Sequence, residues 1–118
     1  MEILVTNNPL VYSNYKNNKN VEYIETDLIG VLTHVRDSIH KGSVLLTHPL
    51  SGSIKPNETP YKTIILKTGN TDTDMQSVKI IEECILTVNK FAPKVILDKY
   101  KEDMQMVDLS LIKSALGD

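Results

Sequence analysis

Residues 47–61 of this 118-residue chain concentrate the side chains that can hold another molecule. The stretch contains three prolines, and between them stand ionisable and hydroxyl side chains. An irregular connection of this length inside a compact domain usually carries function. The residues that we predict to bind a ligand here are His48, Ser51, Gly52, Ser53, Lys55, Asn57, Glu58, Thr59 and Tyr61.

The chemistry predicted for this loop is the binding of a small anion. Backbone amides around Gly52, together with nearby hydroxyls and the Lys55 ammonium group, are the groups that hold a carboxylate or a phosphate. The stretch lacks the glycine spacing and the Gly-Lys-Ser/Thr ending of a phosphate loop. A proline-stiffened surface turn without a ligand is therefore the alternative interpretation.

His48 is the residue to which a catalytic role would fall if the chain were an enzyme. Pro49 restricts the backbone of His48 to extended conformations, and an imidazole can act as an acid or a base near neutral pH. Lys55 and the loop serines would then stabilise negative charge. A single histidine beside a strand is more often a structural residue, so we assign no catalytic residue and favour a binding module.

No metal or cofactor is predicted from the remaining candidates. His34 and His40 are six residues apart and fall on different faces of one helix, which argues against a shared metal. Cys84 lies beside the apolar face of a later helix and is expected to be a small buried side chain. The sequence has no Gly-rich cofactor motif.

The composition excludes several classes of partner and location. A net charge of -2 and a pI near 5.9 provide no basic surface for nucleic acid or an anionic membrane. No apolar run approaches the roughly 18 residues of a membrane-spanning helix, and the first residues do not resemble a signal peptide. A single cysteine excludes an intramolecular disulfide and fits a reducing compartment. We therefore expect a cytoplasmic protein.

Alternating strand and helix patterns predict the elements that must position the loop. Apolar runs at 3–5, 21–24, 43–46 and 63–66 indicate four strands. One helix is expected after a cap at Thr26 or Asp27, and another after a cap at Thr73 or Asp74. Toward the C-terminus we expect a short helix near residues 95–100 and a separate last helix capped by Asp108.

These elements predict one α/β domain over residues 1–118, with a largely parallel four-stranded sheet covered by helices in a Rossmann-like, three-layer arrangement. The direction of the strand at 63–66 stays open, because the long loop before it contains no convincing helix. If the strands at 3–5 and 43–46 run in the same direction, the turn at Asn7 and Asn8 lies at the same edge as His48. Asn7 and Asn8 therefore join the predicted ligand-binding residues.

Several segments together resemble the GrdX family. They are Thr6-Asn7-Asn8-Pro9, Val35-Arg36-Asp37 with His40-Lys41-Gly42, the block from Leu46 to Ser53 that continues through Lys55-Pro56-Asn57-Glu58-Thr59-Pro60-Tyr61, and Val107-Asp108-Leu109-Ser110-Leu111-Ile112. GrdX-like proteins are encoded beside the glycine, sarcosine or betaine reductase genes of anaerobic bacteria that ferment amino acids.

The resemblance implies a cytoplasmic accessory protein of that reductase system, whose partners would be reductase components. It assigns no catalytic residues. The function expected is a binding or assembly module with a small-anion or partner site at 47–61, and the alternative is a small cofactor-independent enzyme that uses His48.

Overall fold

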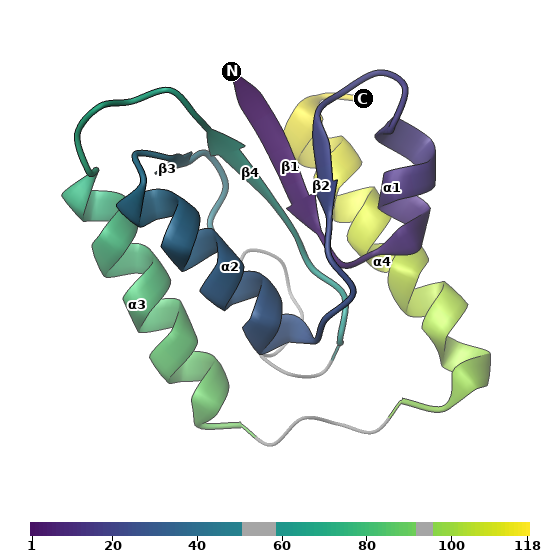
Figure 1. The fold of residues 1–118 in the computed structure, drawn as a ribbon. Coiled ribbons are helices and arrows are strands. Elements are labelled where there is room, and N and C mark those ends of the chain that lie inside the picture. The colour runs from purple at the N-terminus through teal and green to yellow at the C-terminus, as the bar shows by residue number, and fades with distance from the viewer. Residues whose placement is uncertain (51–58, 92–95) are drawn as a thin grey trace.

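The computed structural model describes residues 1–50, 59–91 and 96–118. The predictions for Ser51, Gly52, Ser53, Lys55, Asn57 and Glu58 fall outside the described residues. In the described residues, eight elements follow one another, and Figure 1 labels them in this order.

The core of the fold is a four-stranded sheet in the order β2-β1-β4-β3. Its strands are β1 (Glu2–Thr6), β2 (Val21–Tyr23), β3 (Val44–Leu45) and β4 (Thr63–Lys67). β1 pairs in parallel with β2, but both β1 and β3 pair antiparallel with β4.

The prediction of a largely parallel sheet is therefore wrong, because the sheet is mixed and open. The chain leaves β3, passes through the 47–61 loop and returns as β4 between β1 and β3. An antiparallel return of this kind needs no crossover helix, whereas a parallel strand would need one. This explains why the long loop carries no helical pattern.

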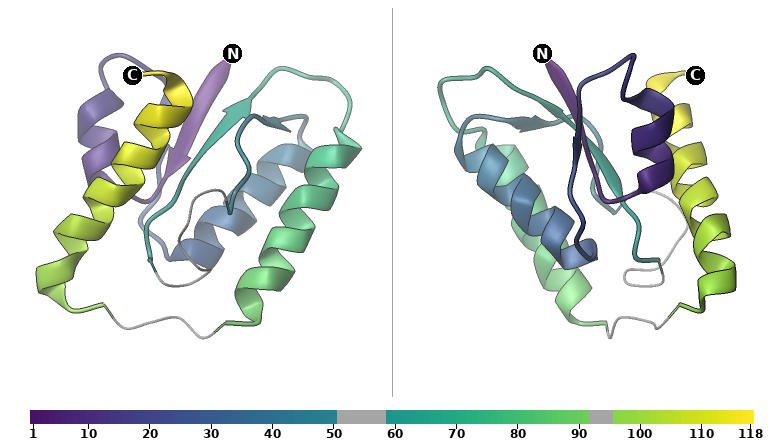
Figure 2. Two further views of the ribbon diagram at one scale, coloured as in Figure 1. Left: turned by 180° about the vertical axis from the view of Figure 1, so that it is seen from behind. Right: turned by 45° about the vertical axis from the view of Figure 1, so that its right-hand side comes forward.

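Helices cover both faces of the sheet and give the molecule three layers (Figures 1 and 2). α2 (Leu28–His40) and α3 (Met75–Asn89) pack on one face. α1 (Pro9–Tyr15) and α4 (Asp98–Leu116) pack on the other. Neighbouring residues of a strand point to opposite faces. Accordingly, Val5 joins the cluster under α2 and α3, while Leu4 joins the cluster under α1 and α4.

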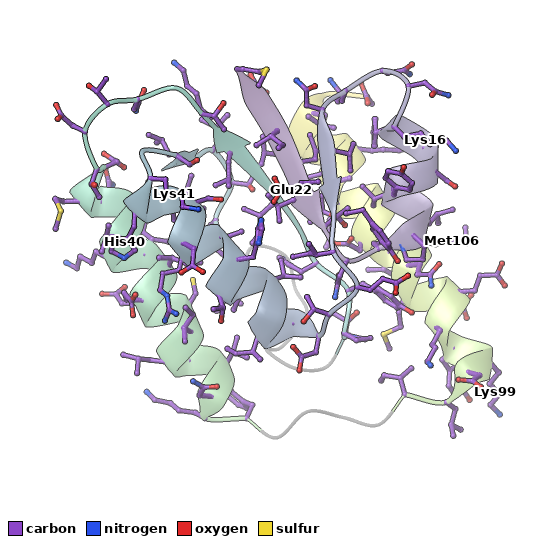
Figure 3. All side chains as sticks on the ribbon, in the orientation of Figure 1. Lys16, Glu22, His40, Lys41, Lys99 and Met106 are labelled. Atoms are coloured by element: carbon purple, nitrogen blue, oxygen red, sulfur yellow. The ribbon has the colours of Figure 1, made fainter. Side chains whose placement is uncertain are left out.

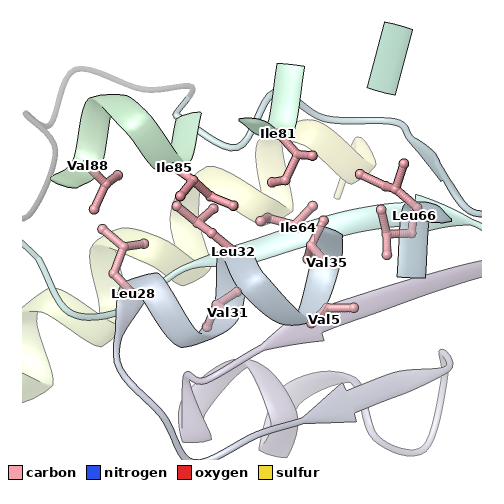
Figure 4. Packing of buried hydrophobic residues seen from close by; sticks show 11 residues of the cluster. Val5, Leu28, Val31, Leu32, Val35, Ile64, Leu66, Ile81, Ile85 and Val88 are labelled. Atoms are coloured by element: carbon pink, nitrogen blue, oxygen red, sulfur yellow. The ribbon is translucent and has the colours of Figure 1, made fainter. Parts of the chain in front are cut away.

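The larger apolar cluster lies between the sheet and the α2–α3 pair (Figure 4). Leu32, Val35 and Ile39 of α2 are fully buried there, as the helical spacing of these residues predicts. Ile81 and Val88 of α3 close the cluster from the other side. The two helices predicted most firmly from sequence are thus the two that build the main core.

The starts of these helices match the predicted caps. Asp27 caps α2 by accepting a hydrogen bond from the Gly30 amide, and Asp74 caps α3 by accepting one from the Ser77 amide. Gly42 follows α2 with φ +107°, and a Cβ atom there would lie 2.1 Å from the Asn70 carbonyl oxygen. Only glycine fits this stop.

The prediction of two separate C-terminal helices is wrong. α4 is one helix of 19 residues, and Asp108 lies in its interior instead of capping it. The Asp108 side chain is buried and faces the sheet. Its partners, described below, come from distant parts of the chain.

These elements form one compact α/β domain. Its radius of gyration is 13.6 Å, which agrees with the roughly 13.5 Å expected for a domain of this length. Among the helices of the described residues, none combines the length and the apolar character needed to cross a membrane.

Candidate functional site

The candidate site is the sheet edge where β1 ends. Because β1 and β3 both run antiparallel to β4, they point in the same direction, but β3 ends at Leu45 opposite Leu66, which is near the start of β1. β4 begins at this edge opposite Thr6, so the end of the 47–61 loop attaches here, whereas the start of the loop is held at Thr47 beside Ile65, in the middle of β4. The predicted neighbourhood of the Asn7–Asn8 turn is thus present for the end of the loop, but β3 does not end at this edge.

The edge between β1 and β2 has the geometry at which open α/β sheets bind ligands. The chain after β1 enters α1 on one face, and the chain after β2 enters α2 on the other. The carboxyl ends of two such strands form a crevice, which is the usual ligand position in this class of fold. Here the side chain of Asn7 occupies that position.

Asn7 acts as a clamp on three segments. Its side-chain Nδ2 donates to the Thr26 carbonyl oxygen at 2.8 Å, just before α2, and to the Pro60 carbonyl oxygen at 2.7 Å. Its Oδ1 accepts from the Lys62 amide at 2.9 Å. The side-chain amide of Asn7 therefore fixes the end of the 47–61 loop against β1 and the start of α2.

Asn8 and Asp108 form the second part of the edge. Asn8 is fully buried; its Oδ1 caps α1 by accepting from the Leu10 amide at 3.0 Å. Its Nδ2 donates to the Gln105 carbonyl oxygen at 2.9 Å and to Oδ2 of Asp108 at 3.0 Å. Asn8 therefore joins the start of α1 to the middle of α4.

A chain of hydroxyl groups leads from β1 to the Asp108 carboxylate. Thr63 donates to Oδ2 of Asp108 at 2.7 Å, and the Oγ1 atoms of Thr6 and Thr63 are 2.7 Å apart. Because an ionised carboxylate only accepts, the Thr63 proton points to Asp108, and Thr63 then accepts from Thr6. The backbone amide of Asn8 donates to Thr6 Oγ1 at 3.0 Å and completes this chain of hydrogen bonds.

The last residues of the loop are tied to α4 as well. Gln105 Nε2 donates to the hydroxyl oxygen of Tyr61 at 3.0 Å, and the Tyr61 amide donates to Thr59 Oγ1 at 3.3 Å. Burial lowers the pKa of the adjacent Lys62, while the negative charge of Asp108 opposes that shift. A lysine and a carboxylate thus interact electrostatically at the base of the loop.

The start of the loop is anchored on the other side of β4. Thr47 Oγ1 accepts from the Ile65 amide at 3.1 Å, and the Leu50 side chain packs against the larger apolar cluster. His48 is exposed between these anchors, and its Nδ1 accepts from the Leu50 amide at 3.1 Å. The Nδ1 atom that accepts this hydrogen bond carries no proton.

Of the predicted site residues, Asn7, Asn8, Thr59 and Tyr61 therefore gather at the end of the loop, and His48 lies at its start. The sequence reasoning missed the residues that join them, namely Thr6, Thr63, Gln105 and Asp108. One signal was present, since Asp108 stands four residues before Ile112 and so on the inward face of a continuous helix.

The remaining candidates for a chemical role are Cys84, His34 and His40, and their surroundings are typical of structural side chains. Burial, with a smaller contribution from Glu83, raises the pKa of the buried Cys84 thiol to about 11, so the reactive thiolate is disfavoured at neutral pH. His34 pairs with Glu22, while His40 is exposed at the end of α2 (Figure 3). In residues 1–50, 59–91 and 96–118, no cluster of three His, Cys, Asp or Glu side chains could hold a metal ion.

The buried polar groups at this edge form hydrogen bonds within the chain. Within the described part of the chain, every buried side-chain nitrogen and oxygen has a hydrogen-bond partner. Asn7, Asn8 and Asp108 therefore fix the position of the end of the loop.

A comparison with protein families gives one match, to the model described as GrdX-like protein, which covers residues 3–117. No curated protein and no solved structure matches the chain. Because the family model spans nearly the whole sequence, the chain belongs to the GrdX-like family.

Proposed function

From this family membership we propose that the chain is a cytoplasmic accessory protein of the glycine reductase system, which works as a binding or assembly module. The site would be the loop at 47–61, together with Asn7 and Asn8 beneath it. Its ligand would be an anionic group, carried either by the surface of a reductase component or by a free small molecule.

The observation that carries this proposal is the way the loop is held. Its start is anchored to β4 and to the larger apolar cluster through Thr47 and Leu50, and its end is anchored at the carboxyl end of β1 through Asn7. Fixing a long loop costs conformational entropy, roughly 1–2 kcal/mol for each ordered residue. A set of hydrogen bonds devoted to its ends supports a role for the loop in recognition.

Binding to purified components of glycine, sarcosine and betaine reductase tests this function directly. The full-length protein should bind at least one component, and His48→Ala should weaken that binding about tenfold, which corresponds to roughly 1.4 kcal/mol. His40→Ala is the matched control, since His40 is also exposed but lies at the far end of α2 (Figure 3). The same measurement in the presence of inorganic phosphate distinguishes an anion on the partner from a free anion.

Two results would contradict the proposal. The first is that the protein binds none of the components and no phosphate. The second is that it binds a component equally well with and without the His48 side chain. A turnover that His48→Ala abolishes while affinity is unchanged would instead favour an enzyme.

A further inference from the structure

A second surface, separate from the loop, lies beside α4. A groove of about 450 Å³ follows this helix next to the start of α1. Its lining is mainly apolar and includes Leu10, Met106 and Leu109, with Glu102 and Lys113 at its two ends. Met106 points outward here and is 59% exposed (Figure 3).

The groove exists because α1 is too short to cover α4. Asn8, at the start of α1, contacts Gln105 and Asp108 of α4, while Tyr15, at its end, bonds Asp118. α1 therefore runs alongside the C-terminal half of α4, and residues 98–103 of α4 are all exposed. Two turns of a helix with no packed face gain little stability from the fold.

The charges of the groove indicate the chemistry of its occupant. Glu102 and Lys113 are eleven residues apart on α4, about 16 Å along the helix axis, so the groove has an acidic end and a basic end. A segment lying in it antiparallel to α4 would place its first turn near Lys113 and its last turn near Glu102. Acidic residues in a first turn and basic residues in a last turn are also what the helix dipole favours.

We propose that this groove binds an amphipathic helix of a partner protein, antiparallel to α4, with acidic residues at its N-terminal end and basic residues at its C-terminal end. The apolar side chains of that helix, spaced as i, i+3, i+4 and i+7, would contact Leu10, Met106 and Leu109. The proposal does not depend on the role of the 47–61 loop, because the groove and His48 can be altered separately.

A second copy of this chain is a poorer occupant. The exposed apolar residues of α4 outside the groove, which include Tyr100, Val107 and Leu111, lie on a different side of the helix from the groove. A second copy that docked this stripe into the groove would make a head-to-tail contact, which extends into filaments unless its rotation closes a ring. We therefore assign the groove to a different protein.

Synthetic helical peptides of roughly 16 residues, long enough to be helical in water, test the assignment. One peptide carries glutamates in its first turn, lysines in its last turn and leucines on one face; the other has the charged ends exchanged. Titration into the full chain, followed by fluorescence anisotropy, should give about tenfold tighter binding of the first peptide. The double variant Glu102→Lys with Lys113→Glu should reverse this preference.

Met106→Glu should weaken binding of the first peptide at least tenfold, because it places a charge on the apolar floor of the groove. Met75→Glu is the matched control, since Met75 is exposed to 69% on α3 and lies outside the groove. Circular dichroism checks that both variants fold. Equal binding of the two peptides, or binding that Met106→Glu leaves unchanged, would overturn the proposal. Self-association in analytical ultracentrifugation that Met106→Glu abolishes would also overturn it, in favour of a second copy.

Discussion

At the scale of single residues, the carboxyl edge is held by side chains that are far apart in the sequence. Asp108 is buried in the middle of a helix and accepts hydrogen bonds from Asn8 and Thr63, which are 100 and 45 residues away along the chain. Asn7 binds the chain before α2 and the end of the loop. Because buried polar groups are costly without partners, these contacts specify how the loop and α4 meet the sheet.

Removal of the Asp108 carboxylate should be among the most destabilising single changes in the protein. Asp108→Ala removes the acceptor of the Thr63 hydroxyl and one of the two acceptors of the Asn8 side-chain amide, so we expect the free energy of unfolding in urea to fall by about 2–4 kcal/mol. Asp103→Ala, at an exposed position of the same helix, should change it by less than about 0.5 kcal/mol. Equal effects of the two substitutions would show that Asp108 does not hold the edge together.

Loss of the Asn7 clamp should free the end of the loop. Asn7→Ala removes the acceptor of the Lys62 amide and the donor to Pro60, so hydrogen exchange at the Lys62 amide should accelerate well beyond that of the β4 interior. The free energy of unfolding should fall by about 2 kcal/mol. Asn17→Ala, in the exposed turn after α1, is the control and should leave that amide unchanged. Unaltered protection of Lys62 in Asn7→Ala would contradict the clamp.

The stability of the protein should decrease in alkaline solution through Tyr15. Burial, and then the hydrogen bond and charge of Asp118, raise the pKa of Tyr15 from 10.0 to about 12. Folding therefore favours the protonated phenol, and this contribution is complete below pH 10 and is lost as the pH rises toward 12. The free energy of unfolding should fall less steeply in this range for Tyr15→Phe than for the wild type. The same slope in both proteins would contradict the assignment, and Tyr100→Phe, at an exposed position, is the control.

At the scale of elements, the sequence predicted the parts whose signals are local. α2 and α3 have strong apolar periodicity, and their caps at Asp27 and Asp74 are where the pattern places them. α4 has a weak apolar pattern because its first turns are exposed, and this made one helix resemble two. Asp108 resembled a cap because its real partners, on β4 and before α1, cannot be read from neighbouring residues.

The direction of β4 and the order of the strands could not be predicted for a similar reason. Apolar runs identify strands, but pairing depends on contacts across the sheet, such as Ile3 with Leu66 and Leu4 with Ile65. The proximity of Asn7 to the end of the loop was predictable, whereas ligand binding by these residues stays a prediction. The hydroxyl chain from Thr6 to Asp108 could not be predicted, because nothing in the sequence near each of these residues indicates that the fold brings them together.

The cap of α3 should also stabilise the edge strand β3. Asp74 Oδ2 accepts from the Ser77 amide and hydroxyl, and Ser77 Oγ in turn accepts from the Leu45 amide. Asp74→Ala should therefore cost about 1 kcal/mol of unfolding free energy and speed hydrogen exchange at the Leu45 amide. Asp72→Ala, an exposed position of the same loop, is the control. Unchanged exchange at Leu45 would show that β3 does not depend on this cap.

At the scale of the whole molecule, the fold presents two separate surfaces. The end of the 47–61 loop lies at the carboxyl end of β1, and the groove is lined by residues of α4 and by Leu10 of α1. Gln105, which lines the groove, links the two surfaces, because its side chain donates to the Tyr61 hydroxyl at the base of the loop and its carbonyl oxygen accepts from Asn8. The two surfaces that we propose for recognition would suit the assembly role that we propose for the protein.

Hydrogen–deuterium exchange of the full chain, alone and saturated with purified reductase components, tests the proposed role of the loop most directly. We expect a component to slow exchange in the peptides that cover residues 47–50 and 59–62, while the turn at 69–74 exchanges as in the free protein. Protection confined to other regions, or no protection with any component, would contradict the account.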